Sequence, residues 1–156
     1  MRITLILPFL TCLACANDLP DENSTDDPST EFADVVEVVV SGEPGAYQFS
    51  VTLESPDTGC DQYADWWEVV SSDGALLYRR ILTHSHVEEQ PFTRSGSPVA
   101  IATDQEVWVR AHMKNRGYGG ITFYGNAVDG FAKRDMPVDF ATSLGQEAPL
   151  PDGCRF

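Results

Sequence analysis

Three histidines are the side chains whose type and spacing best suit chemistry. One residue separates His84 from His86, so an extended backbone would place both imidazoles on the same side, and His112 lies on a later candidate strand. Imidazole nitrogens bind zinc and copper, and the carboxylates of Glu88 and Glu89 follow closely in the sequence. The candidate metal site is therefore His84, His86, His112 and Glu89, with zinc or copper as the cofactor.

The same residues partly resemble the first metal motif of the cupins. The matching positions are His84-x-His86, Glu89 and Gly96, and the resemblance implies a metal-binding protein or metal-dependent enzyme with His112 as the third histidine. The motif is incomplete, because Tyr78 stands where it has glycine, too few residues separate His86 from Glu89, and no Pro-x-Gly precedes His112. The alternative is that the histidines lie on a surface loop.

A loop rich in oxygen ligands gives a second metal hypothesis. Asp57, Asp61 and Asp65 lie within one short stretch and could bind calcium, although the order of EF-hand ligands is absent. The alternative is a polar loop that connects two strands.

Aromatic and arginine side chains gather in the second half of the chain and predict a ligand surface. Aromatic faces stack on sugars or cations and guanidinium groups bind carboxylates, so the ligand would be a protein, a glycan or a small molecule. The alternative is that the tryptophans fill the core and the arginines pair with neighbouring carboxylates. The candidate surface consists of Trp108, Arg110, Arg116 and Tyr118.

Nothing in the sequence supports nucleophilic or glycosidase chemistry. There is no Gly-x-Ser-x-Gly elbow and no His-Glu-x-x-His motif, and the adjacent Glu88 and Glu89 would face opposite sides of a strand. Cys60 and Cys154 are the cysteines left once a signal segment is removed, and in an oxidising compartment they are expected to form a disulfide.

The elements that must position these residues follow a period of two, which is typical of β-strands. Apolar and polar residues alternate over 47–54 and 106–114, and Asp73-Gly74 sits in the turn of a hairpin formed by 66–70 and 76–82. Further strands are expected at 35–40, 99–102 and 121–124, with an irregular tail over 127–156. The alternation predicts that Phe49, Val51, Leu53, Val107, Val109 and Ala111 are interior, and that Gln48, Thr52, Arg110 and His112 face outward.

About seven short strands predict an all-β fold, a single antiparallel β-sandwich. Strand number and spacing, with a tryptophan on the third strand, resemble an immunoglobulin or fibronectin type III domain. The Cys-Trp-Cys spacing of antibody domains is absent.

The N-terminal residues predict export. Residues 1–16 have the charge and the short apolar run of a signal peptide, which ends either after Ala16 or, as in a lipoprotein, before Cys15. Residues 17–33 form an acidic linker expected to be disordered, and residues 34–156 form the sandwich domain. The chain would then be secreted, periplasmic or lipid-anchored in the cell envelope.

The net charge of the chain limits the classes of partner that it could bind. A formal net charge of −14 argues against nucleic acid and anionic membrane surfaces, so a membrane would be reached only through a lipid anchor. The sequence therefore predicts an exported, non-catalytic module with a binding or structural role, and the alternative is the His-ligated metal protein.

Overall fold

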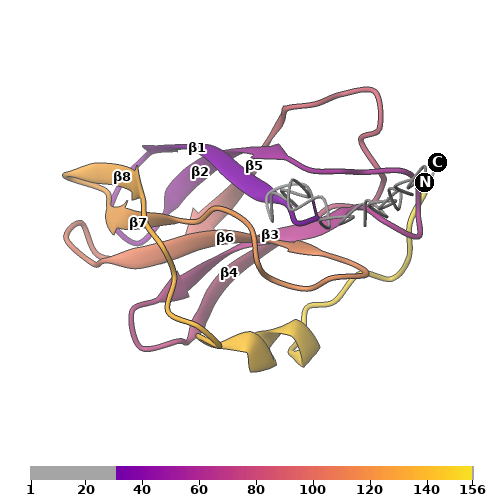
Figure 1. Cartoon of the computed structure of the whole chain (residues 1–156). Coiled ribbons are helices and arrows are strands. Elements are labelled where there is room, and N and C mark those ends of the chain that lie inside the picture. Colours follow the sequence, from indigo (N-terminus) through magenta and orange to yellow (C-terminus); the bar gives the residue numbers. More distant parts are fainter. Residues whose placement is uncertain (1–30, 156) are drawn as a thin grey trace, which may run out of the picture.

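The computed structural model describes residues 31–155, which fold as two antiparallel sheets packed face to face (Figure 1). The smaller sheet has the order β1 (Asp34–Ser41), β2 (Tyr47–Glu54), β5 (Phe92–Val99). The larger has the order β4 (Leu76–Ile81), β3 (Ala64–Ser71), β6 (Val107–Met113), β7 (Phe123–Asn126), β8 (Gly130–Lys133). The predicted all-β sandwich is confirmed, whereas the narrower resemblance to immunoglobulin or fibronectin type III domains stays a prediction.

The core between the sheets is built from the side chains that the alternation predicts to be interior. Phe49, Val51 and Leu53 on β2 face Val107, Val109 and Ala111 on β6, and all six are buried. On the opposite face of β2, Gln48 is exposed and Thr52 is partly exposed. The predicted hairpin is also confirmed, because β3 pairs with β4 across a turn in which Gly74 has φ of 93°.

The outer face of the larger sheet is covered, which the alternation does not reveal. Arg110 does point away from the core, as predicted, but it is only 1% exposed, and every residue of β3 is buried. The cover is the C-terminal tail, which crosses this face and includes a 3-10 helix at Thr142–Gln146 (Figure 1). The prediction that Arg110 lies on a solvent-facing surface is therefore wrong, because the tail replaces solvent there.

A second apolar cluster lies beneath the tail. Val70, Trp108 and Leu144 are its buried members, with Tyr124 and Phe140 packed against them. The expectation of an irregular tail is thus only partly right, because its first residues form β8 and its later residues pack as a layer.

Strand β5 occupies residues for which the sequence predicts no strand. The expected strand at 99–102 overlaps it only at Val99, because β5 contains Gly96 and Pro98 and few apolar residues. Gly96 is required by packing: a Cβ there would lie 2.5 Å from the Tyr78 ring and 2.9 Å from the Trp67 ring. Glycine thus permits close packing of β5 against the larger sheet.

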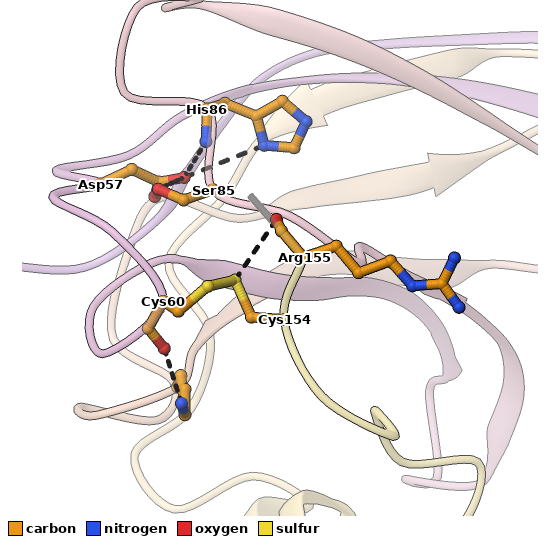
Figure 2. Close-up of a disulfide and its surroundings, with 7 residues drawn as sticks. Asp57, Cys60, Ser85, His86, Cys154 and Arg155 are labelled. Atoms are coloured by element: carbon orange, nitrogen blue, oxygen red, sulfur yellow. Dashed lines mark hydrogen bonds and ion pairs between the residues drawn. A yellow bond between two sulfur atoms is a disulfide. The ribbon is translucent and has the colours of Figure 1, made fainter.

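The predicted disulfide between Cys60 and Cys154 is confirmed, with a separation of 94 residues along the chain. Figure 2 shows it joining the loop before β3 to the end of the tail. The backbone N–H of Arg155 also donates to the carbonyl of Thr83 at 2.7 Å. The tail is consequently held at its end as well as along the sheet.

The proposed signal segment 1–16 and most of the linker 17–33 lie outside the described residues. Ala33, placed at the end of that linker, is buried in the core, so the packed domain begins at or before it. Within residues 31–155, no helix is long and apolar enough to cross a membrane.

Candidate functional site

A cleft with a volume of about 500 Å³ lies between the β6–β7 loop and the C-terminal tail. Its walls come from the start of β3, from the end of β6 with the loop that follows, and from the tail at residues 145–153. The side chains that concern its chemistry are Asp65, Trp66, His112, Lys114 and Arg116. We call this cavity the tail cleft.

His112 is the most precisely held side chain of the tail cleft. Its Nδ1 lies 2.7 Å from Oδ1 of Asp65, and its ring stacks on Trp66 with centroids 3.7 Å apart and planes 9° apart. The edge of Tyr118 closes the opposite side, with centroids 4.8 Å apart. Nε2 has no partner among the described residues and is not buried, so it is the ring nitrogen available to a ligand.

Asp65 sets the orientation of this imidazole. It is 4% exposed, and burial raises the pKa of its carboxyl group, while the hydrogen bond and the charge of His112 act in the opposite direction. A buried carboxylate on Nδ1 is also how acid–base sites orient a histidine. However, none of the described residues that line the cleft is a serine, threonine or cysteine, so the pair has no adjacent nucleophile.

Two cations stand at the mouth of the tail cleft. Lys114 donates from Nζ to the carbonyl of Cys60 at 2.6 Å, which links the β6–β7 loop to the disulfide. The exposed Arg116 lies 3.4 Å from Glu31, and a pair between exposed groups contributes little stability. Both side chains therefore retain donors for a ligand.

A buried ion network beside the tail cleft holds the tail in place. Glu68 on β3 accepts from Nε of Arg79 at 2.7 Å and from Nε of Arg110 at 2.8 Å. The remaining guanidinium nitrogens donate to tail carbonyls: Arg79 to Leu144, Glu147 and Pro149, and Arg110 to Phe140 and Ala141. One carboxylate thus pairs with two buried arginines, and the other donors of these arginines hold the tail.

Tyr118 lies over this network. The guanidinium of Arg110 is 3.6 Å from the centroid of its ring, and burial, helped by the charge of Glu68, raises the pKa of Tyr118 to about 12. Arg110 and Tyr118 also line a second cavity of about 410 Å³, bounded by residues 119–122, 133–140 and 142. We call this second cavity the strap cavity.

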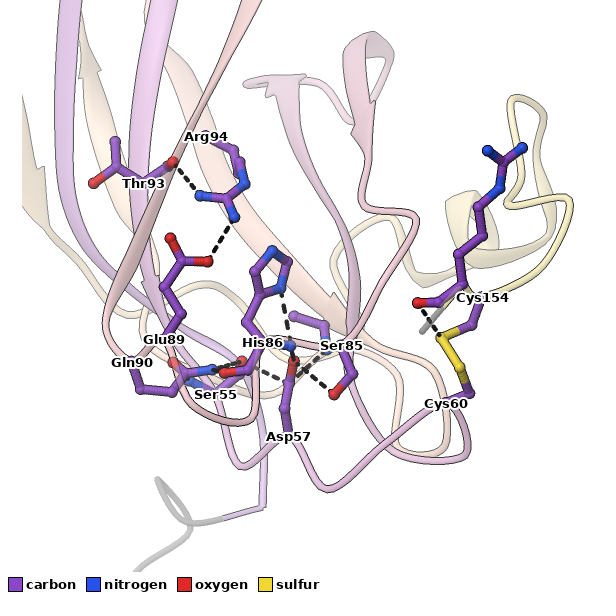
Figure 3. A network of polar contacts seen from close by, with 12 residues as sticks. Ser55, Asp57, Cys60, Ser85, His86, Glu89, Gln90, Thr93, Arg94 and Cys154 are labelled. Atoms are coloured by element: carbon purple, nitrogen blue, oxygen red, sulfur yellow. Dashed lines mark hydrogen bonds and ion pairs between the residues drawn. A yellow bond between two sulfur atoms is a disulfide. The ribbon is translucent and has the colours of Figure 1, made fainter.

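The structure does not bring the predicted metal ligands together. His86 is buried, stacks on Phe92 at 3.7 Å and has Nδ1 3.8 Å from Asp57, whereas His112 belongs to the tail cleft. Glu89 pairs instead with Arg94 at 2.8 Å (Figure 3). Among residues 31–155, no group of three His, Cys, Asp or Glu side chains is placed to hold an ion, so the geometry gives no support to a site formed by His84, His86, His112 and Glu89.

His84 and His86 are neighbours, as their spacing predicts, with ring centroids 4.4 Å apart. Both ring nitrogens of His86 are buried without a hydrogen-bond partner. Burial, with contributions from Arg94 and His84, lowers the pKa of His86 to about 4, so its ring is neutral at pH 7.

The geometry also gives no support to the calcium hypothesis, since its three aspartates have separate roles. Asp57 accepts from the hydroxyl of Ser55 and from the backbone N–H groups of Ala64 and His86, which ties two loops together (Figure 3). Asp65 pairs with His112, and Asp61 is exposed.

The candidate ligand surface is divided by the fold. Trp108 is buried in the second apolar cluster, Arg110 and Tyr118 line the strap cavity, and Arg116 lines the tail cleft. Sequence reasoning missed Asp65, Trp66 and Lys114 as neighbours of His112. Lys114 and Arg116 follow His112 at intervals of two, a pattern that could have grouped them.

Comparison with known proteins gives one relative. No family model matches the chain, and no solved structure matches it. A protein of Halomicrobium mukohataei named "Putative lipoprotein" is 43% identical over 101 residues, which are 64% of this chain and 50% of that protein. The chain thus spans about half the length of the curated relative that it matches.

Proposed function

We propose that this chain is an exported binding module, anchored in the cell envelope through Cys15, which holds a small molecule in the tail cleft. The observation that carries the binding role is the geometry of His112. A buried carboxylate and a stacked indole fix its ring, and its Nε2 is left open to a cavity of about 500 Å³. Cavities of roughly 300 to 1,000 Å³ are the size in which proteins bind small molecules.

Export and anchoring have separate support. The N-terminal residues have the pattern of a signal peptide, Leu13-Ala14-Cys15 resembles the end of a lipobox, and the relative is named a lipoprotein. The disulfide fits an oxidising compartment.

The binding role is tested by screening a fragment library of mixed charge against the oxidised mature protein by two-dimensional NMR. We expect hits to shift the resonances of His112, Gly117 and Gly145. A matched screen of His112→Asn, which removes Nε2 while keeping an amide nitrogen near the position of Nδ1 beside Asp65, should lose these hits. Hits that shift only residues around the strap cavity, or hits that bind both proteins equally, would contradict the proposal.

A further inference from the structure

The charge of the tail cleft is opposite to that of the chain as a whole. The formal net charge of the protein is −14, yet Lys114 and Arg116 stand at the mouth of the cleft. Asp65 is the one carboxylate among the described lining residues, and it is buried against His112 at 2.7 Å. An entering ligand therefore meets two cations and no free anion.

The donors of these groups can converge on one negatively charged group. Lys114 uses one of its three N–H groups on Cys60, and among the described residues the guanidinium of the exposed Arg116 has only the 3.4 Å hydrogen bond to Glu31. His112 adds a third nitrogen, because Asp65 occupies Nδ1 and leaves Nε2 open to the cleft. Hydrogen bonds from ionised donors to carboxylate or phosphate oxygens are about twice as strong as neutral ones.

The opposite wall of the tail cleft is apolar. Leu150 and Pro151 line it from the tail, and Leu150 is 43% exposed, so its side chain has surface left to bury. Burying apolar area contributes roughly 25 cal/mol per Å², which favours a ligand with a hydrocarbon or ring body. A nucleic acid is disfavoured, since the strongly negative chain repels a polyanion.

We infer that the tail cleft binds a small organic anion, in which a carboxylate or phosphate group contacts Lys114, Arg116 and His112 while an apolar body lies against Leu150 and Pro151. The inference rests on the proposed function, because it names the class of ligand for the same site.

The test is an NMR titration of the oxidised mature protein with three probes of similar size: phenyl phosphate, benzoate and the neutral benzyl alcohol. We expect saturable shifts at residues 112–117 with at least one of the two anions, and at least tenfold weaker binding of benzyl alcohol. Saturation by only one anion identifies the preferred acidic group and also supports the inference.

Substitutions of single cationic side chains show whether their charge is responsible for binding the anion. Arg116→Gln and Lys114→Gln should each weaken binding of the anion about tenfold, as expected for one charge-assisted contact. The matched control is Lys133→Gln, because Lys133 lines the strap cavity and its loss should change binding by less than twofold. All three residues are exposed, so we expect each variant to keep its fold. The same NMR spectra check this.

Two failures are distinguishable. If benzyl alcohol binds residues 112–117 as tightly as the anions do, or if Arg116→Gln and Lys114→Gln bind the anion like the unmodified protein, the anion inference is overturned while the cleft remains a binding site. If no probe shifts residues 112–117 and the fragment screen also finds no ligand there, both the inference and the proposed function fail.

Discussion

Removing the charge of Glu68 should detach the C-terminal tail. In Glu68→Gln the side chain keeps its size, but two guanidinium groups, on Arg79 and Arg110, lose the carboxylate with which both are paired. All three side chains are 0 to 1% exposed, so solvent cannot take over that role. Breaking a buried ion pair from one side typically costs about 3 to 5 kcal/mol, and we expect a loss in this range.

The loss of stability in Glu68→Gln should appear first in the C-terminal tail. The two arginines donate to five tail carbonyls, at residues 140, 141, 144, 147 and 149, and these bonds depend on guanidinium positions that Glu68 sets. We therefore expect faster proteolytic cleavage within residues 136–149 under conditions in which the sheets remain folded. Urea denaturation followed by circular dichroism measures the free energy of unfolding, and mass spectrometry locates the cleavage sites.

The matched control is Glu106→Gln, which changes an exposed carboxylate on the same side of the sandwich. Glu106 accepts from the hydroxyl of Tyr124 at 2.8 Å, and its loss should cost less than about 1 kcal/mol. If Glu68→Gln costs no more than this control, or if its tail is cleaved no faster, the network does not hold the tail and the reasoning is refuted.

Three further predictions concern the disulfide, acid and the anchor. Cys154→Ser should lower the free energy of unfolding by about 4 kcal/mol, since the bond closes a loop of 94 residues, and thermal melts with and without reductant measure this. Because the pKa of His86 is lowered to about 4, the unfolded state binds the extra proton between pH 6.5 and 4. Stability should therefore fall as pH falls through that window, by on the order of 3 kcal/mol. His86→Phe should flatten that dependence in urea melts, and an unchanged slope would exclude His86 as its cause. Cys15→Ser should release the protein from the membrane fraction of the native host, whereas retention there would contradict a lipid anchor at Cys15.

Local sequence determined the strands whose alternation is regular. Residues 47–54 and 106–114 read as strands because four apolar side chains occupy alternate positions in each. The structure confirms both strands, the second at Val107–Met113, and their inward faces. Asp73-Gly74 likewise predicted the turn of a hairpin, and two cysteines in a chain expected to be exported predicted their bond. These features depend on residues close in sequence or, for the disulfide, on the pairing of two cysteines.

The sequence did not reveal strand β5, because its stability comes from its neighbours. Ser, Thr, Gly and Pro dominate residues 93–98, and they form a strand because β2 offers an open edge and Gly96 admits the rings of Tyr78 and Trp67. Intrinsic preference for strands is weak and readily overruled by such packing.

Tertiary structure determines which of the candidate site residues are buried and which line the cleft. Alternation shows that Glu68, Arg110 and His112 point away from the core, but it cannot show whether solvent or another segment lies there. The tail comes back over that face from far along the chain, which buries Glu68 and Arg110 as an ion network and leaves His112 at the edge of a cleft. The three-dimensional path of residues 134–155 decides which of these charged side chains is buried and which is exposed. Burial depends on contacts between segments that are distant in sequence, so local alternation does not reveal it.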